Sequence, residues 1–346
     1  MRNTSVLTLC ATVACGMILT SCGDKPSDQP AAGKIVVGFS QIGAESDWRS
    51  ANTLSIKGEA KKRGVDLRFT DAQQKQENQI KALRSFIDQK VDVIAFSPVV
   101  ETGWQGVLEE IRGAGIPVIL TDRGVDVADK SLFVTLISPD TVEEGRRAAR
   151  WFAENTTGDL KVFELRGTPG SSPAIDRKQG FDEVIAKHER ITIIKSQDGN
   201  FERGKGKEVM EAFLKTPEAK DFNALYAHND DMALGAIQAM KEAGLKPGVD
   251  IKIVSIDAVK AAFHAMIDGE LNCTVECSPL LGPQLFDTIE TVLAAKTLKQ
   301  HGAKHKLIKP EVLDAMKTDI FVKRIMVEEG VFDQSQAKEL LDSRQY

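Results

Sequence analysis

The sequence predicts an α/β protein made of two similar lobes, each a doubly wound, mostly parallel sheet. Three observations indicate this fold class. The chain has 346 residues, a length that favours two domains over one. From Lys34 onward, short runs rich in β-branched residues alternate with longer segments of helical period, the pattern of a parallel sheet with helices on both faces. The alternation restarts near residue 141 with a similar layout, which indicates a second lobe of the same kind.

In the first lobe, strands are expected where apolar residues form short runs, at 35–40, 66–70, 91–97, 117–121 and 132–137. Helices are expected where apolar residues recur at helical spacing, at 48–63, 78–89 and 102–114. Gly64 and Gly115 directly follow the first and third of these helices, and glycine commonly ends a helix. The strands therefore alternate with helices and are expected to run parallel.

The second lobe follows the same rules. Its strands are expected at 161–165, 191–196, 224–227, 252–255 and 273–276. Helices are expected at 141–155, 174–188, 202–214, 231–243, 261–268 and 283–295. From Lys306 the chain is less regular, with Pro310 and an apolar stretch at 320–327. A helix is expected to start after Pro310, and the segment ends in a charged tail.

The composition is that of a globular chain with enough apolar residues for a sizeable core. Hydrophobic residues make up 42% and charged residues 27% of the chain, close to the average for globular proteins. Lys and Arg number 45 against 50 Asp and Glu, a formal charge of −5. Nucleic-acid binders usually carry a dense basic patch interleaved with aromatic residues, and the sequence shows none. Nucleic acid is therefore excluded as a partner.

The first residues are expected to direct export. Residues 1–21 carry a positive charge at Arg2 and then a largely apolar run at 6–19, too short to span a bilayer as a mature helix. The Leu-Thr-Ser-Cys run at 19–22 resembles a bacterial lipobox. We therefore predict a lipoprotein signal peptide at 1–21, lipidation of Cys22, and a flexible tether at 22–33. An ordinary secretory signal with an incidental cysteine is the alternative.

Cysteine usage and glycine motifs indicate neither a metal site nor a cofactor. Of five cysteines, only Cys273 and Cys277 follow the tether, too few for a disulfide scaffold. In an extended strand their spacing exceeds disulfide range, and their redox state stays open. A zinc site would need two further ligands that no nearby Cys or His pair supplies. The run at 199–206 resembles a phosphate-binding loop but lacks the Ser or Thr that must follow the lysine.

Polar side chains follow several predicted strands, at the edge where open parallel sheets bind ligands. Those after strands or after the Gly- and Pro-rich turn at 167–173 are Gln41, Glu45, Trp48, Arg49, Asp122, Arg123, Arg177, Asn229 and Asp257. Carboxylates accept hydrogen bonds, guanidinium groups donate them in fixed forks, and an amide does both. Such a set suits a polyol, with Trp48 covering an apolar C–H face. Each residue taken alone also has a purely structural interpretation. Asp122 and Arg123 could form an ion pair within a loop, and the neighbouring Asp230 or Asp231 is expected to cap a helix.

The same residues resemble a known family, the periplasmic sugar-binding proteins of ABC transporters, of the ribose-binding type. The resemblance covers nearly all of the predicted mature chain. Its segments are VGFSQ at 37–41, ESDWR at 45–49, DAQQKQENQI at 71–80, SPVV at 97–100, DR at 122–123, AIDRK at 174–178, YAHNDDM at 226–232 and GLKPG at 244–248. Together these segments are specific, whereas each alone would be weak.

The resemblance implies a type I periplasmic binding protein fold, in which two lobes joined by three crossings close over a monosaccharide. It places residues 34–137 and about 279–306 in the first lobe, and 138–278 and about 307–346 in the second. By position, the implied sugar contacts are Glu45, Arg49, Asp122, Arg123, Arg177, Asn229 and Asp257, with Gln41, Trp48 and Glu276 as further candidates.

The function that the resemblance implies is that of the substrate-binding component of an ABC sugar importer. The expected ligand is galactofuranose or a related aldose, and the expected partner is the transporter's permease. The protein is expected to be a monomer without enzymatic activity, held in the periplasm or at the outer face of the cytoplasmic membrane by its lipid anchor.

Two other functions remain open. The same trap could serve a sensor that presents its closed form to a chemoreceptor or kinase ectodomain. A glycosidase could use two of Glu45, Asp122 and Asp257, provided that they lie ~5 to 9.5 Å apart across a bond. A cytoplasmic repressor is disfavoured, because no DNA-binding helices are expected before Lys34.

Overall fold

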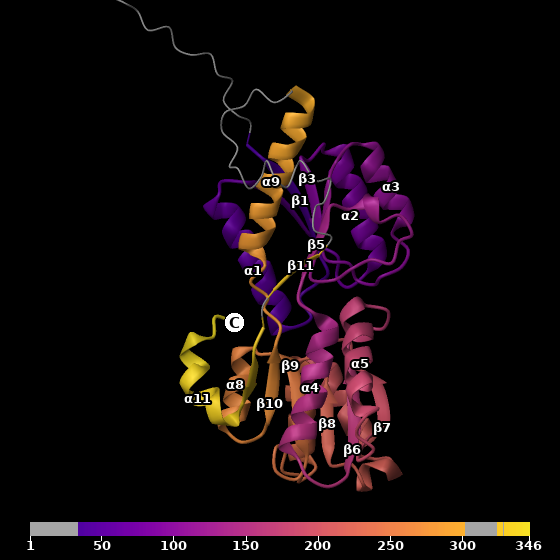
Figure 1. Ribbon diagram of the computed structural model, residues 1–346, viewed down its shortest axis with the longest axis vertical. Coiled ribbons are helices and arrows are strands. Elements are labelled where there is room, and N and C mark those ends of the chain that lie inside the picture. The colour runs from indigo at the N-terminus through magenta and orange to yellow at the C-terminus, as the bar shows by residue number, and fades with distance from the viewer. Residues whose placement is uncertain (1–33, 302–323, 328) are drawn as a thin grey trace, which may run out of the picture. The chain divides into compact units, whose positions relative to one another are not determined.

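A computed structural model of the chain describes residues 34–301, 324–327 and 329–346. The predicted signal peptide at 1–21, Cys22 and the predicted tether lie outside these residues. Over the ranges described, no helix is both long enough and apolar enough to cross a membrane. The described residues form two six-stranded sheets with helices packed on them (Figure 1), which confirms the predicted α/β fold class.

The first sheet has the strand order β11-β5-β4-β3-β1-β2, and all its neighbouring strands are parallel. Its strands are β1 (Val36–Gln41), β2 (Asp66–Asp71), β3 (Val93–Phe96), β4 (Val118–Thr121), β5 (Thr135–Ser138) and β11 (Arg324–Met326). Its helices are α1 (Asp47–Lys62), α2 (Gln76–Asp88), α3 (Gln105–Gly113), the short 3-10 helix η1 (Lys130–Leu132) and α9 (Gly282–His301).

Helices cover both faces of this first sheet (Figure 1). Along β3, Val93 and Ala95 belong to the core beneath α1 and α9, whereas Ile94 and Phe96 belong to the core beneath α2 and α3. All four side chains are fully buried. Successive side chains of a strand point to opposite faces, so a strand covered on both sides must be apolar throughout. This explains why the sequence shows an unbroken apolar run here.

The second sheet has the order β12-β10-β9-β8-β6-β7, and β12 is its one antiparallel strand among the residues described. Its strands are β6 (Leu160–Arg166), β7 (Ile191–Asp198), β8 (Ala224–Ala227), β9 (Lys252–Asp257), β10 (Cys273–Glu276) and β12 (Val331–Asp333). Its helices are α4 (Thr141–Asn155), α5 (Ser172–Ile185), α6 (Arg203–Phe213), η2 (Pro217–Lys220), α7 (Asp230–Glu242), α8 (Lys260–Ile267), α11 (Gln334–Leu340) and η3 (Leu341–Ser343).

Stacked aromatic rings attach helices to this second sheet. Phe163 of β6 stacks on Phe213 of α6 with ring centroids 3.9 Å apart. Tyr226 of β8 stacks on Phe181 of α5 with centroids 4.1 Å apart. Offset stacking of buried rings contributes beyond the area that the rings bury. These pairs therefore fix where α5 and α6 sit over the strands.

The chain passes between the two sheets three times, from β5 to α4, from β10 to α9 and from β11 to β12. Three crossings are what the family resemblance implies. The strand β11 departs from the predicted division, which assigned everything from about residue 307 to the second lobe. It pairs with β5 of the first sheet, Arg324 opposite Leu136, and its Ile325 packs on the first lobe's core. Burial of that apolar side chain accounts for its placement.

Two local predictions also change. The segment predicted as a strand at 132–137 is preceded by η1, because the Asp129 side chain accepts a hydrogen bond from the backbone N–H of Ser131 at 2.9 Å. The cap of α7 is Asn229 rather than Asp230 or Asp231: its side chain accepts from the backbone N–H of Met232 at 3.0 Å. Asp230 and Asp231 lie in the first turn of that helix, where carboxylates also favour the helix.

Candidate functional site

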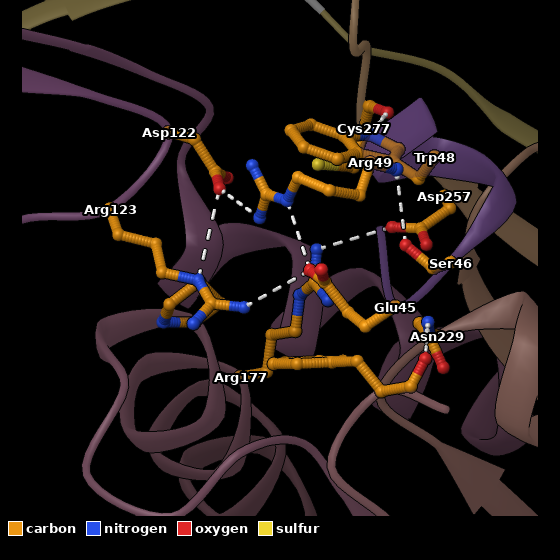
Figure 2. A pocket seen from close by; sticks show the side chains of 12 residues that line it. Glu45, Ser46, Trp48, Arg49, Asp122, Arg123, Arg177, Asn229, Asp257 and Cys277 are labelled. Atoms are coloured by element: carbon orange, nitrogen blue, oxygen red, sulfur yellow. Dashed lines mark hydrogen bonds and ion pairs between the residues drawn. The ribbon is translucent and has the colours of Figure 1, made fainter. Parts of the chain in front are cut away.

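A cavity lies between the loops of the two lobes (Figure 2). Its lining residues from the first lobe are Glu45, Ser46, Trp48, Arg49, Asp122 and Arg123. Its lining residues from the second lobe are Pro173, Arg177, Phe201, Asn229 and Asp257, and Cys277 lies on the crossing after β10. The polar residues predicted from strand ends therefore converge on one space, with the exceptions of Gln41 and Glu276.

The start of α1 places Glu45 and Arg49 side by side. Ser46 caps this helix by accepting a hydrogen bond from the backbone N–H of Arg49 at 3.1 Å. With the first turn fixed, Arg49 Nε donates to Glu45 Oε1 at 2.9 Å and Arg49 Nη2 donates to Asp122 Oδ2 at 2.6 Å. Figure 2 shows the Glu45 carboxylate between the guanidinium groups of Arg49 and Arg123. All these side chains are almost fully buried.

Asp122 and Arg123 turn into the cavity directly after β4. The Asp122 carboxylate also accepts from Ser97 Oγ at 3.1 Å, and Arg123 Nη1 donates to the carbonyl of Val99 at 3.0 Å. Both partners follow β3, the neighbouring strand. The carboxyl ends of adjacent parallel strands thus hold the two side chains in place, as expected of this edge of the sheet.

Arg177 projects from α5 in the second lobe. Its Nε donates to Glu144 Oε2 at 2.7 Å, its Nη1 donates to the carbonyl of His228 at 2.5 Å, and its Nη2 lies 3.6 Å from Asp257 Oδ1. Three partners from three elements hold the guanidinium plane, which leaves its orientation little freedom.

Backbone strain collects at the cavity. Asp122, Phe201 and Asp257 have positive φ angles of 62°, 65° and 124°, in a region that non-glycine residues rarely adopt. Such strain costs about 1 to 3 kcal/mol per residue and clusters at functional sites. Each of these three side chains lines the cavity, so the unusual backbone is what aims them inward.

Two aromatic side chains complete the walls. Trp48 donates from its indole Nε1 to the carbonyl of Cys277 at 2.5 Å, and the Arg49 guanidinium lies 4.6 Å from its ring centroid. Phe201 lies below two guanidinium groups, Arg123 at 5.2 Å and Arg177 at 5.8 Å. The rings provide apolar faces beside charged groups, which a sugar ring with both C–H and O–H groups can use.

The charges in the cavity are unequally balanced. Burial lowers the pKa of Arg49, but the carboxylates of Asp122 and Glu45 outweigh burial and raise it above its ordinary value. Burial, followed by repulsion from Arg49, lowers the pKa of Arg123 to about 10. Arg123 thus lies beside cations, and its ion pairs with Glu45 and Asp122, at 3.9 and 3.8 Å, are longer than those of Arg49.

Several buried polar atoms in the cavity have no hydrogen-bond partner in the part of the chain that the structure describes. They are Oε2 of Glu45, Nη1 of Arg49 and Nε of Arg123. Unpartnered buried polar atoms are rare and costly in native proteins. Here they comprise one acceptor and two donors, all from residues that line the same cavity. The site is therefore suited to a ligand that both donates and accepts hydrogen bonds, as a hydroxyl does.

The cavity is small in this conformation, with a volume of about 20 Å³, which is room for about one water molecule. A monosaccharide needs more space than this. The site must therefore open, by exchange of the internal ion pairs for ligand contacts or by separation of the lobes about the crossings.

Gln41 and Glu276 do not line the cavity, and other contacts explain them. Gln41 Nε2 donates to Asn52 Oδ1 at 2.9 Å, and its Oε1 accepts from the backbone N–H of Ile42 at 3.0 Å. Glu276 accepts from Arg344 Nη1 at 2.9 Å and from the backbone N–H of Gly330 at 3.0 Å. Both side chains thus have partners that direct them away from the cavity in this conformation.

Four lining residues were absent from the predicted site: Ser46, Pro173, Phe201 and Cys277. Ser46 lies within the motif ESDWR, and Pro173 ends the Gly- and Pro-rich turn. Their positions in these two segments could therefore have indicated that both residues line the site. Phe201 lies in the run that resembles a phosphate-binding loop, where nothing in the sequence indicates a sugar contact. Cys277 directly follows β10, on the crossing to α9, and the sequence does not indicate that this crossing lines the cavity.

Comparison with known proteins gives one family and closely similar sugar-binding proteins. Residues 37–297 match the periplasmic binding protein domain family. The galactofuranose-binding protein YtfQ of Escherichia coli K12 is 51% identical to this chain over 276 residues, which cover 79% of this chain and 87% of that protein.

Solved structures agree with this match. The periplasmic binding protein of the arabinose ABC transporter from Shewanella sp. ANA-3, bound to α- and β-L-arabinofuranose, is 49% identical with a TM-score of 0.80, covering 90% of this chain and 95% of its own. A Mycobacterium smegmatis protein in complex with β-D-fucofuranose is 48% identical with a TM-score of 0.81, covering the same shares. This chain therefore has the same two-lobed α/β fold as these structures.

Proposed function

Because this chain belongs to the periplasmic binding protein family, we propose that it is the sugar-binding component of an ABC importer, which traps a monosaccharide between its lobes. The observation that carries this proposal is the cavity lining: guanidinium, carboxylate and amide groups from both lobes face one space, and some of their buried atoms have no partner. A bound polyol would supply those partners from its hydroxyl groups.

The ligand proposed is galactofuranose or a related aldose. The similar proteins reported above are named for, or are bound to, sugars in the furanose form. In this chain, Arg49, Arg123 and Arg177 would donate to ring and exocyclic hydroxyl oxygens, while Glu45, Asp122 and Asp257 would accept. Asn229 would do both through its amide, and Trp48 would cover a C–H face.

The proposed role requires no covalent chemistry. The proteins to which this chain is similar are named as binding proteins, and in this chain the candidate carboxylates are paired with arginines rather than with each other. We therefore propose reversible binding, followed by presentation of the closed form of a monomer to the importer's permease. Prolonged incubation should return the sugar unchanged.

The proposed location is the periplasm or the outer face of the cytoplasmic membrane, with a lipid anchor at Cys22. The support is the Leu-Thr-Ser-Cys run at 19–22. Metabolic labelling with a radioactive fatty acid should then mark the wild type but not a Cys22→Ser variant, and failure of the wild type to take up the label would count against the anchor.

The direct test is a thermal stability screen across pentoses and hexoses. A ligand at ~100 times its Kd adds ~2.7 kcal/mol of stability when it binds only the folded state, which raises the melting temperature by a few degrees. We expect the largest rise with galactofuranose or a closely related furanose, and a smaller rise with glucopyranose as the matched control. No shift with any sugar would contradict the proposed function.

A further inference from the structure

Behind the cavity, a second group of ionisable side chains lies where the crossings meet the second lobe. Glu144 of α4, Cys277 after β10 and Glu329 between β11 and β12 bring their side-chain ligand atoms within 4.8 Å of one another. Glu144 and Cys277 are fully buried or nearly so. Glu329 comes from the last crossing, and its backbone carbonyl accepts from Arg147 Nη1 at 2.8 Å.

This cluster touches the sugar site through Arg177. Glu144 Oε2 accepts from Arg177 Nε at 2.7 Å, and the guanidinium of Arg177 faces the cavity. Glu144 can reach it because the α4 and α5 backbones nearly touch: a Cβ on Gly145 would lie 2.1 Å from the carbonyl oxygen of Arg177. Whatever holds Glu144 in place therefore also holds Arg177.

The carboxyl groups of Glu144 and Glu329 each have a buried oxygen without a hydrogen-bond partner among the residues described. In both residues this oxygen is Oε1. Two ionised carboxylates have only acceptor oxygens, so their approach in a buried site is doubly unfavourable. One proton shared by the pair would give both oxygens a hydrogen-bond partner, because a protonated carboxyl can donate to the other carboxylate.

The charges that face the pair favour a proton over a metal ion. From α4 come Glu144 and Arg147, from α5 Arg177, and from the crossing after β10 the thiol of Cys277. A cation here would have to lie beside the Arg177 guanidinium, which already satisfies Glu144 Oε2. Burial raises the pKa of the Cys277 thiol well above its ordinary range, so this group stays neutral and offers no thiolate.

We propose that the Glu329 carboxyl is protonated and donates a hydrogen bond to Glu144, so that Glu329 is a positioning residue for the sugar-binding guanidinium of Arg177. Burial, and next the charge of Glu144, raise the pKa of Glu329 to about 11, which agrees with a proton retained at neutral pH. The effect on sugar affinity rests on the proposed function, whereas the protonation itself does not.

The consequence for stability has a definite sign. The folded protein holds a proton that the unfolded chain releases above the ordinary glutamate pKa of 4.5. The contribution of Glu329 to stability is therefore complete below that value and declines as pH rises towards about 11. In that window the folding equilibrium constant loses up to about tenfold per pH unit relative to a chain with a neutral side chain at this position.

The first experiment measures urea unfolding of the wild type and of Glu329→Gln from pH 6 to 9 without sugar. We expect the folding constant of the wild type, divided by that of Glu329→Gln, to fall as pH rises. The reason is that glutamine donates the same hydrogen bond without a proton to lose. Glu154→Gln, exposed on α4, serves as the matched control and should show no such trend. Burial also raises the pKa of the Asp230 and Asp257 carboxyls, so the infrared band of protonated carboxyls should be weaker in Glu329→Gln than in the wild type at pH 9, but still present.

Parallel pH profiles for the wild type and Glu329→Gln, with equal intensity of that infrared band in both, would overturn the proposal. So would stabilisation of the wild type by added Zn²⁺ that is lost in Cys277→Ser, because it would show a cation in place of the proton. Neither outcome depends on sugar binding, so neither is confused with failure of the proposed importer function.

The second experiment measures affinity for the sugar identified in the thermal screen. Glu329→Gln should keep the wild-type Kd within about twofold, whereas Glu329→Ala should raise it about tenfold by leaving Glu144 unpartnered. Equal Kd values for Glu329→Ala and the wild type, in proteins that bind sugar normally, would show that Glu329 does not position Arg177.

Discussion

Single side chains in the cavity are charged although they are buried, and each depends on its partner. Arg49 is 3% exposed and pairs with both Glu45 and Asp122. Removing one member of a buried pair leaves the other charged and unsolvated, which costs far more than the pair itself contributes. A hydroxyl group of a bound ligand can replace the lost partner of a buried charge, but the empty space left by a truncated side chain cannot. Substitutions here are therefore expected to change binding strongly, and shape-conserving ones are the most informative.

Asp122→Asn should weaken sugar binding while the fold persists. Asparagine has the same shape and tolerates the positive φ of 62° at this position, so the backbone should not move. It loses the charge that pairs with Arg49 and one acceptor oxygen for the sugar. We expect calorimetry to show a loss of ~1 to 3 kcal/mol in binding free energy. Asp88→Asn, exposed at the end of α2, is the control, and equal affinities of the two variants would remove Asp122 from the site.

Among the elements, the pair α4 and α5 sets the geometry of Arg177. Their backbones approach at two glycines, one on each helix: a Cβ on Gly145 would meet the carbonyl oxygen of Arg177, and one on Gly180 would lie 1.9 Å from the carbonyl oxygen of Val142. Glycine costs helix stability, so its presence in the interior of both helices is explained by the close packing that it permits. That packing brings Glu144 within reach of Arg177.

Gly180→Ala should destabilise the protein and weaken sugar binding together. The added methyl group must push α4 and α5 apart, because the obstructing atom belongs to the backbone, and overpacking of this kind costs ~1 to 3 kcal/mol. Gly106→Ala is the matched control: nothing lies within 4 Å of its Cβ, so alanine should stabilise α3 by up to ~1 kcal/mol. Denaturant unfolding measures both, and equal stability of the two variants would show that the helices yield without cost.

Over the whole molecule, contacts between the lobes close the rim of the cavity. The backbone N–H of Asp47 in α1 donates to Asp231 of α7 at 2.8 Å, and Arg203 of α6 bridges both carboxylates at 2.8 and 2.7 Å. Beside them, Gln74 donates to Glu202 at 3.0 Å across the same boundary. These contacts connect the first lobe to the second without touching the cavity lining, and they stabilise the closed form.

Arg203→Ala should speed sugar release. The Arg203 side chain is 45% exposed, and ion pairs of this kind contribute ~0.2 to 1 kcal/mol, so the dissociation rate should rise by a factor of about 1.4 to 5. The association rate should change little. Lys205→Ala is the matched control on the same helix, since Lys205 pairs with Glu208 of its own helix. Stopped-flow displacement measures the rates, and identical rates for both variants would show that Arg203 does not hold the lobes together.

Several features were predictable because local physics decides them. The doubly covered strands show as unbroken apolar runs, and the polar residues that follow them, such as Asp122 and Asn229, lie at the sheet edge where parallel strands end. Phe201 was missed because its role depends on a positive φ, and the glycines of the run at 199–206 indicated a phosphate-binding loop rather than an aromatic cavity wall. Gln41 does not line the cavity, because Asn52 and the backbone of Ile42 hold its amide, and a strand-end position does not reveal those contacts.

Taken by itself, the sequence determined the order of the strands and main helices as far as α9 and the set of polar residues available at strand ends, since both follow from periodicity and chain position. Only the tertiary structure decided which of those residues face one cavity, that β11 returns to the first sheet, and that Glu144 meets Glu329. The physical reason is separation along the chain. Contacts between residues 144 and 329, or 49 and 122, depend on how whole helices and crossings pack, and no local pattern encodes that distance.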